Sequence, residues 1–132
     1  MIIVLKTAGA TATLALHEAG GKALAGDEWE SGRQLSSQLL SHIEALLHAQ
    51  KSTWDDLSGI VVFRGPGSFT SLRIGITVAN AMAYAKAIPI VGEVDENWAD
   101  KGIKRLAAKA NDGQVMPHYG APANITKPKG MS

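Results

Sequence analysis

Residues 59–63 form a short, continuous apolar run, Gly59-Ile-Val-Val-Phe63. A run of this length without alternating polar residues is typical of a strand that is covered on both faces. A glycine-rich turn and a long apolar helix pattern follow it. Because parallel neighbours in a sheet need a covering crossover, this order favours an α/β domain with a central strand at 59–63.

The flanking patterns predict four further strands. Residues 2–6 are apolar and β-branched, and residues 11–17 alternate in hydrophobicity. Gly20 and Gly21 supply a tight turn before a third strand at 22–29, so the chain opens with an antiparallel meander. A last apolar strand is predicted at 88–91. The order strand, strand, strand, helix, strand, helix, strand predicts a mixed sheet packed against helices.

Three helices are predicted between and after these strands. The first, residues 32–50, starts at Ser31 as the N-cap, and Gln34 completes a capping box. It places six large aliphatic residues on one broad face: Leu35, Leu39, Leu40, Ile43, Leu46 and Leu47. The second, residues 71–86, carries Ile74, Val78, Met82 and Ala85 on one face.

The third predicted helix, residues 95–111, is capped by Asp95 and ended by Gly113. Its inward face holds Trp98, Ile103, Leu106 and Ala110. The resulting organisation is an α/β lobe over residues 1–94, a C-terminal helix packed on it over 95–113, and a proline-rich tail over 114–132.

Composition excludes several classes of function. The 132 residues suffice for a single core, in which roughly two-thirds of the unfolded surface is buried. The 13 basic and 12 acidic side chains nearly cancel, so charge does not indicate direct binding to a nucleic acid. The chain has no cysteine, which excludes disulfides and thiolate sites. No apolar stretch reaches the roughly 18 to 20 residues of a membrane span, and we expect a cytoplasmic protein.

The turn from Gly65 to Thr70 is the main candidate for chemistry. Glycines between a strand and a helix let backbone amides converge on an anion, so phosphate binding is one interpretation. A structural turn is the other, because the lysine of a Walker A loop and the three spaced glycines of a dinucleotide fingerprint are missing. Ser68 and Thr70 then serve as helix caps.

No other pattern predicts catalysis or a metal site. Ser68 lacks the Gly-x-Ser-x-Gly elbow of hydrolases, and the acidic residues form no pair that spacing would place together. The four histidines show no metalloprotease spacing: His17, His42, His48 and His118. The surplus of aliphatic residues in the first helix leaves two interpretations open, a buried core face or a helix-on-helix interface with a partner.

Residues 64–92 resemble the signature region of the TsaB (YeaZ-like) family, whose usual form is Arg-Gly-Pro-Gly-Ser-Phe-Thr-Gly-Leu-Arg-Ile-Gly. The matching signature residues are Arg64, Gly65, Pro66, Gly67, Ser68, Phe69, Thr70 and Arg73. Arg33 to Ser36 resembles the family's first-helix start, and Tyr119 with Asn124 to Lys129 resembles its C-terminal ending. A family member normally carries a second α/β lobe, which is largely missing here.

The resemblance implies one lobe of the actin-like and sugar-kinase (ribonuclease H-like) fold. It further implies a non-catalytic scaffold of tRNA N6-threonylcarbamoyladenosine synthesis that binds a TsaD-like transferase and works beside a TsaE-like ATPase and a TsaC-like synthase. tRNA would be contacted only indirectly. The implied interface residues on the two helices are Leu39, Ile43, Leu46, Val78, Ala81 and Met82.

Departures from the family pattern argue against independent chemistry. Lys6 stands where the family usually has aspartate, Ser71 replaces a glycine, and Leu35 replaces a common histidine. Without a second lobe, no nucleotide cleft forms within one chain, so we expect no cofactor, with ATP and magnesium only within a complex. The competing hypotheses are a self-sufficient nucleotide-binding or ATP-hydrolysing protein that uses the Gly65–Thr70 turn, and a homodimer that occupies its own partner surface.

Overall fold

The computed structural model describes residues 1–31 and 34–118. Its strands are β1 Ile2–Lys6, β2 Thr11–His17, β3 Ala23–Glu30, β4 Gly59–Phe63 and β5 Ile90–Glu93. Its helices are α1 Leu35–Ala49, α2 Phe69–Lys86 and α3 Trp98–Ala107, with a short 3-10 turn, η1, at Trp54–Asp56. The strand and helix order is the predicted one.

The five strands form one sheet in the order β3-β2-β1-β4-β5. The first three pair antiparallel, whereas β4 and β5 run parallel to β1. Ala15, Val4, Val61 and Val91 lie in register across four strands. All five residues of β4 are buried, as the continuous apolar run predicts. The predicted mixed sheet with an antiparallel meander is confirmed.

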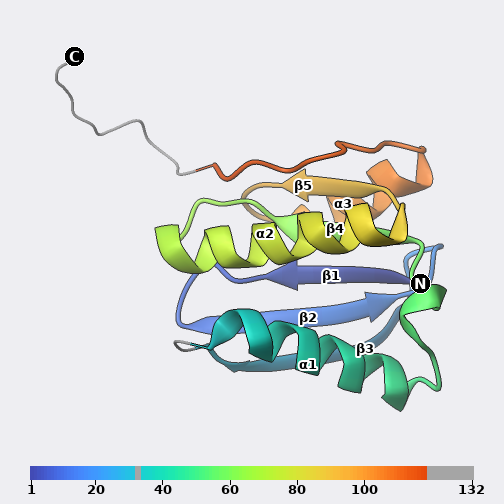
Figure 1. The fold of residues 1–132 in the computed structure, drawn as a ribbon. Helices are drawn as coiled ribbons and strands as arrows, with labels where there is room; N and C mark the ends of the chain where they lie inside the picture. Colours follow the sequence, from blue (N-terminus) through green and yellow to red (C-terminus); the bar gives the residue numbers. More distant parts are fainter. Residues whose placement is uncertain (32–33, 119–132) are drawn as a thin grey trace, which may run out of the picture.

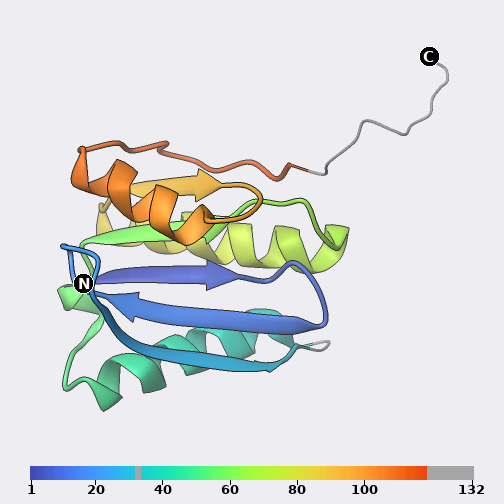
Figure 2. The ribbon, with the colours of Figure 1, turned by 180° about the vertical axis from the view of Figure 1, so that it is seen from behind.

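The helices cover the sheet unequally. Helices α1 and α2 lie side by side on one face, and α3 lies on the other face against β4 and β5 (Figures 1 and 2). The larger core fills the space under α1 and α2, with Ile3, Leu5 and Leu16 fully buried. A smaller cluster under α3 is built on Val4, Val61 and Ile103.

The start of α1 differs from the prediction. The helix begins at Leu35, three residues later than expected, and Gln34 occupies the N-cap position without a side-chain hydrogen bond. The predicted capping box is wrong because Ser31 is used elsewhere: its hydroxyl donates to the carbonyls of Gly9 and Ala10. Ser31 therefore ties the end of β3 to the β1–β2 turn.

The starts of α2 and β5 also differ from the prediction, whereas α2 ends at Lys86 as expected. Helix α2 begins at Phe69, and Ala87 follows it in the left-handed conformation. The Ile88 amide donates back to the Ala83 carbonyl, so residue 88 completes the helix end and β5 starts only at Ile90. The buried residues of α2 are Leu72, Gly75, Ile76, Ala79, Met82 and Ala83. Of the predicted face, only Met82 is in this buried set.

Helix α3 is shorter than the predicted span of 95–111. Asp95 and Asn97 have φ values of 62° and 61°, which break helical geometry, so Asp95 does not cap the helix. The helix ends at Ala107, and Lys109 with φ 70° turns the chain before Gly113 is reached.

Residues 114–118, part of the predicted tail, pack against the lobe. Val115 is only 3% exposed, and its backbone N–H and C=O pair with the Asn80 side chain on α2. Residues 111–118 are called the strap from here on. Tyr119 and Asn124 to Lys129, which carry the predicted C-terminal motif, lie outside the described residues, as does Arg33.

Candidate protein-binding site at the signature loop and paired helices

The signature loop, residues 64–70, joins β4 to α2 and begins with Arg64. The Arg64 amide donates to the Glu93 carbonyl at 2.9 Å, and its Nε donates to the Met116 carbonyl at 2.8 Å. Its own carbonyl accepts from the His118 amide at 2.6 Å. Arg64 therefore holds the ends of β4 and β5 and the strap together.

Residue 65 has to be glycine for two reasons, its backbone conformation and the atoms that surround it. Its φ of +128° is a value that L side chains rarely adopt, and a Cβ at this position would overlap the His118 carbonyl oxygen. The Gly65 carbonyl accepts from the Asp95 amide at 3.2 Å. This glycine thus permits close approach of the strap rather than of a ligand.

The second half of the loop packs on the turn between β1 and β2. The Ser68 amide donates to the Ala8 carbonyl at 2.8 Å, and a Cβ on Gly67 would lie 2.5 Å from the Ala8 Cβ. Ser68 occupies the N-cap position of α2 without a side-chain hydrogen bond, and Thr70 lies inside the first turn, so the predicted hydroxyl caps are wrong. Two amides of the loop, at Arg64 and Ser68, are already used within the chain, which supports a structural turn.

Lys6 lies at the carboxyl end of β1, at the position where the resemblance in sequence led us to expect aspartate. Its Nζ is 4.4 Å from the centre of the Phe63 ring, within the range of a cation–π contact. Phe63 in turn meets Trp98 edge to face, with ring centres 5.5 Å apart. The position that would supply a carboxylate instead holds a cation against an aromatic pair.

His42 and His17 each make a polar contact within the lobe. His42 on α1 pairs with Asp27 on β3 at 2.5 Å and stacks on Trp29 at 3.7 Å, which fixes α1 against the edge of the sheet. His17 contacts the Gly21 carbonyl through Nδ1. Within residues 1–31 and 34–118, no three histidine, aspartate or glutamate side chains are grouped closely enough to hold a metal ion.

A surface groove runs between the start of α1 and the outer side of α2. It has a volume of about 340 Å³ and is called the α1–α2 groove. Its lining consists of Ser36, Phe69, Thr70, Arg73, Ile74, Thr77 and Val78. Phe69 is 53% exposed, and the Arg73 guanidinium lies 5.2 Å from its ring centre. The groove is mainly apolar with one cation at its rim.

Leu40 extends the apolar surface along α1. It lies one helical turn beyond Ser36, on the same side of the helix, and is 46% exposed. The other five aliphatic residues predicted on this face of α1 are buried: Leu35, Leu39, Ile43, Leu46 and Leu47. Five of the six aliphatic residues therefore belong to the core, as the first interpretation predicts. Only Leu40 is at the surface, where the second interpretation would place a partner.

The structure distributes the six predicted interface residues between core and surface. Leu39 and Ile43 are fully buried, and Leu46 and Met82 are each 8% exposed, all within this chain's own core. Val78 is half-buried and lines the α1–α2 groove. Ala81 is exposed on α2. Contact with a partner stays a prediction for all six residues. Of these, only Val78 and Ala81 are not buried in this chain's own core.

The interface residues implied by the resemblance do not include Leu40, Ile74 or Phe69, none of which is buried. One signal was available: consecutive residues on a helix point about 100° apart, so Leu39 and Leu40 face different directions. Phe69 was assigned to the loop, and only the earlier start of α2 places it on the helix surface beside Arg73.

The order of the strands and the placement of the helices identify the fold. A five-stranded mixed sheet in the order β3-β2-β1-β4-β5, with two helices on one face and one on the other, is an actin-like, ribonuclease H-like lobe. The structure of Thermus thermophilus RuvC matches 89% of this chain and 85% of that chain with a TM-score of 0.50 at 10% identity, which shows the fold alone.

Sequence comparisons identify closer relatives. A family model described as TsaD, tRNA N6-adenosine threonylcarbamoyltransferase, matches residues 30–94. The tRNA threonylcarbamoyladenosine biosynthesis protein TsaB of Bacillus subtilis (strain 168) is 35% identical over 88 residues, covering 65% of this chain and 35% of that protein. TsaB of Escherichia coli (strain K12) is 32% identical over 95 residues, covering 67% and 41%.

The solved structures agree with these relatives. YeaZ from Pseudomonas aeruginosa matches with a TM-score of 0.63 at 30% identity, covering 71% of this chain and 43% of that chain. Over the part that these comparisons match, the chain belongs to the TsaB/YeaZ family. It spans about two-fifths of the length of these relatives. No helix in residues 1–31 and 34–118 is long and apolar enough to cross a membrane.

Proposed function

We propose that this chain is a non-catalytic scaffold subunit of tRNA N6-threonylcarbamoyladenosine synthesis that binds a TsaD-like transferase through the α1–α2 groove. The pathway is that named for the TsaB relatives. The observation that carries the proposal is the apolar surface on α1 and α2, formed by the exposed Leu40 and Phe69 and by the half-buried groove residues Ile74 and Val78.

The shape and chemistry of this surface fit a helical partner. The exposed part of α2 has Thr77 and Ala81 at successive turns, and small residues let a second helix approach closely. Phe69 offers a large apolar contact at one end of this stretch. Arg73 at the groove rim would pair with a carboxylate on the partner, which would add specificity to apolar burial.

The contacts made by the candidate residues support the non-catalytic part of the proposal. The Arg64 and Ser68 amides and Gly65 are engaged in contacts that hold the lobe together, and Lys6 lies against Phe63. In this proposal the signature loop fixes the orientation of α2 relative to the sheet, and the transferase catalyses the reaction. A TsaE-like ATPase and a TsaC-like synthase would act on the assembled pair.

The test is direct binding between the purified chain and a cognate TsaD-like protein, measured by calorimetry. We expect a complex at micromolar concentration, and Leu40→Asp or Val78→Asp should weaken it at least about tenfold, since each places a charge against an apolar partner surface. Ala107→Asp is the matched control, because it adds the same charge on α3, on the opposite face of the sheet.

Two results would contradict the proposal. The first is no complex with any cognate TsaD-like protein. The second is a complex that both Leu40→Asp and Val78→Asp leave unchanged. A second copy of the chain is the other molecule that could cover this surface. Light scattering on the chain alone would detect it, because a homodimer has twice the mass of the monomer without any transferase present. Complementation in cells that lack TsaB would then measure the contribution to tRNA modification.

A further inference from the structure

The outer edge of β5 is closed by side chains instead of by another strand. Strand β5 pairs with β4 on one side only, so the backbone groups of Ile90 and Gly92 face away from the sheet. An edge of this kind normally presents unpaired donors and acceptors that another strand can recruit.

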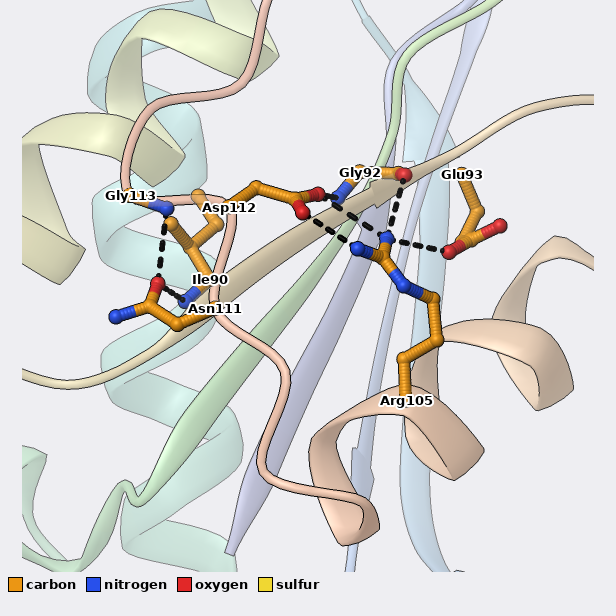
Figure 3. Close-up of polar contacts among 7 residues, drawn as sticks. All are labelled: Ile90, Gly92, Glu93, Arg105, Asn111, Asp112 and Gly113. Carbon is orange, nitrogen blue, oxygen red and sulfur yellow. Dashed lines mark hydrogen bonds and ion pairs between the residues drawn. The ribbon is translucent and has the colours of Figure 1, made fainter.

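All four of these outward groups have partners in the segment that follows β5. The Ile90 amide donates to Asn111 Oδ1 at 3.1 Å, and the Ile90 carbonyl accepts from the Asp112 amide at 2.7 Å. The Gly92 amide donates to Asp112 Oδ2 at 2.9 Å, and the Gly92 carbonyl accepts from Arg105 Nη1 at 3.4 Å. The side chains of Asn111 and Asp112 thus stand where the carbonyls of a sixth strand would be (Figure 3).

Ion pairs and a local turn hold this arrangement in place. Arg105 reaches from α3 and contacts both Asp112 oxygens, at 2.5 and 3.1 Å, and Glu93 at 2.8 Å (Figure 3). Asn111 Oδ1 also accepts from the Gly113 amide at 2.9 Å, which fixes its orientation. Hydrogen bonding to Arg105 holds the pKa of Asp112 below its ordinary range, so the acceptor for Gly92 stays ionised at neutral pH.

The two edges of the sheet are protected differently. Strand β3, at the other edge, carries the charged residues Asp27, Glu28 and Glu30, which oppose strand pairing. Strand β5 begins with Ile90-Val91-Gly92, which has no charge and is buried. An apolar edge strand without charges needs another form of protection.

We propose that residues 105–113 are an edge guard, which keeps β5 from pairing with the same strand of a second copy of this chain. The family-model match ends at residue 94, so the guard lies in the part of the chain that the match leaves out. Without the guard, we expect the free edge of β5 to pair with β5 of a second copy. Two such edges present identical, uncharged and complementary backbone groups.

The test compares the wild-type chain with the Asn111→Ala/Asp112→Ala variant by amide hydrogen exchange and by sedimentation. In dilute solution, exchange at the Ile90 and Gly92 amides should rise about tenfold, the effect expected from loss of one hydrogen bond each. At high concentration the mass should rise towards that of a dimer, and exchange at these two amides should slow again. The Val91 amide, on the β4 side, should stay protected throughout.

Asp55→Ala is the matched control, because it removes one negative charge from an exposed pair with Lys86 that supplies none of the contacts to Ile90 or Gly92. It should remain monomeric. The Asp112→Asn variant keeps an acceptor oxygen for Gly92 and should also remain monomeric. If the double variant does not fold, Asp112→Ala alone is measured in the same way.

The proposal is overturned if a folded alanine variant remains monomeric at high concentration. It is also overturned if exchange at Ile90 and Gly92 is unchanged in that variant, or if Asp55→Ala associates to the same extent.

Discussion

The Thr7 hydroxyl and the backbone of Gly75 are in direct contact. Thr7 is 2% exposed, and its Oγ1 donates to the Ser71 carbonyl at 2.8 Å. A Cβ on Gly75 would overlap this hydroxyl. Helix α2 can therefore lie this close to the end of β1 only because residue 75 has no side chain. The Thr7 hydrogen bond and Gly75 together determine how closely α2 packs on the sheet. This helix carries most of the α1–α2 groove.

Gly75→Ala should destabilise the chain despite a better helix propensity. Alanine gains about 1 kcal/mol over glycine in a helix interior, whereas overpacking a core costs about 1–3 kcal/mol, and loss of the Thr7 hydrogen bond adds about 1 kcal/mol. We expect a net loss of about 1–3 kcal/mol in urea unfolding. Gly20→Ala, at a position with nothing within 4 Å of the added Cβ, should be nearly neutral. A stabilised Gly75→Ala variant would contradict the observed packing.

Ile43→Asp and Leu40→Asp should have opposite consequences, although both residues are aliphatic and lie on α1. Ile43 is 0% exposed, so an aspartate there would be an unpaired charge in the core, and we expect the variant not to fold. Leu40 is 46% exposed, so Leu40→Asp should retain wild-type circular dichroism and change thermal stability by less than about 1 kcal/mol. A folded Ile43→Asp chain would show that the core lies elsewhere.

Gly65→Ala should loosen the strap more than the rest of the lobe. The added Cβ would overlap the His118 carbonyl oxygen, and the φ of +128° disfavours alanine independently. We expect faster amide exchange at His118 and Val115, and a loss of about 1–3 kcal/mol in stability. Gly9→Ala, where nothing lies within 4 Å of the added Cβ, is the control. Unchanged exchange at His118 would contradict the role assigned to Gly65.

Elements with a strong local pattern could be predicted from the sequence. The alternation at residues 11–17 and the continuous apolar run at 59–63 place β2 and β4 within the predicted bounds, because burial on one or both faces leaves a direct record in the residue pattern. The two lobe-covering helices were also predicted, with errors only at their ends. The ends depend on capping, where Ser31 has alternative partners in the β1–β2 turn.

Elements held by side-chain contacts between distant segments could not be predicted. The strap is fixed by Asn80, Asn111 and Asp112, whose amide and carboxylate groups bind backbone that is 20 to 35 residues away. Such contacts leave no periodic pattern in the sequence. The sequence alone therefore assigns residues 114–118 to a tail. The α1–α2 groove has the same origin, because its lining requires the relative placement of two helices that are separated by β4.

The stability contributed by the Arg105–Asp112 pair should depend on pH in a defined direction. Hydrogen bonding to Arg105 lowers the pKa of Asp112 below its ordinary value of 3.8. The folded chain therefore favours the ionised carboxylate more than the unfolded chain does, so the pair stabilises the fold above pH 3.8. This contribution is lost as the pH falls through the lower, folded-state pKa, where the carboxylate takes up a proton in both states.

Asp112→Asn measures this contribution. At neutral pH we expect the variant to be less stable than the wild-type chain by about 1–2 kcal/mol in urea unfolding, since a charge-assisted pair becomes a neutral one. The gap should narrow as the pH falls below 3.8, because the wild-type side chain also becomes neutral. Asp55→Asn, which affects an exposed pair with Lys86, should show little difference at any pH. A gap that stays constant or widens in acid would mean that Arg105 and Asp112 do not stabilise the fold through their charges.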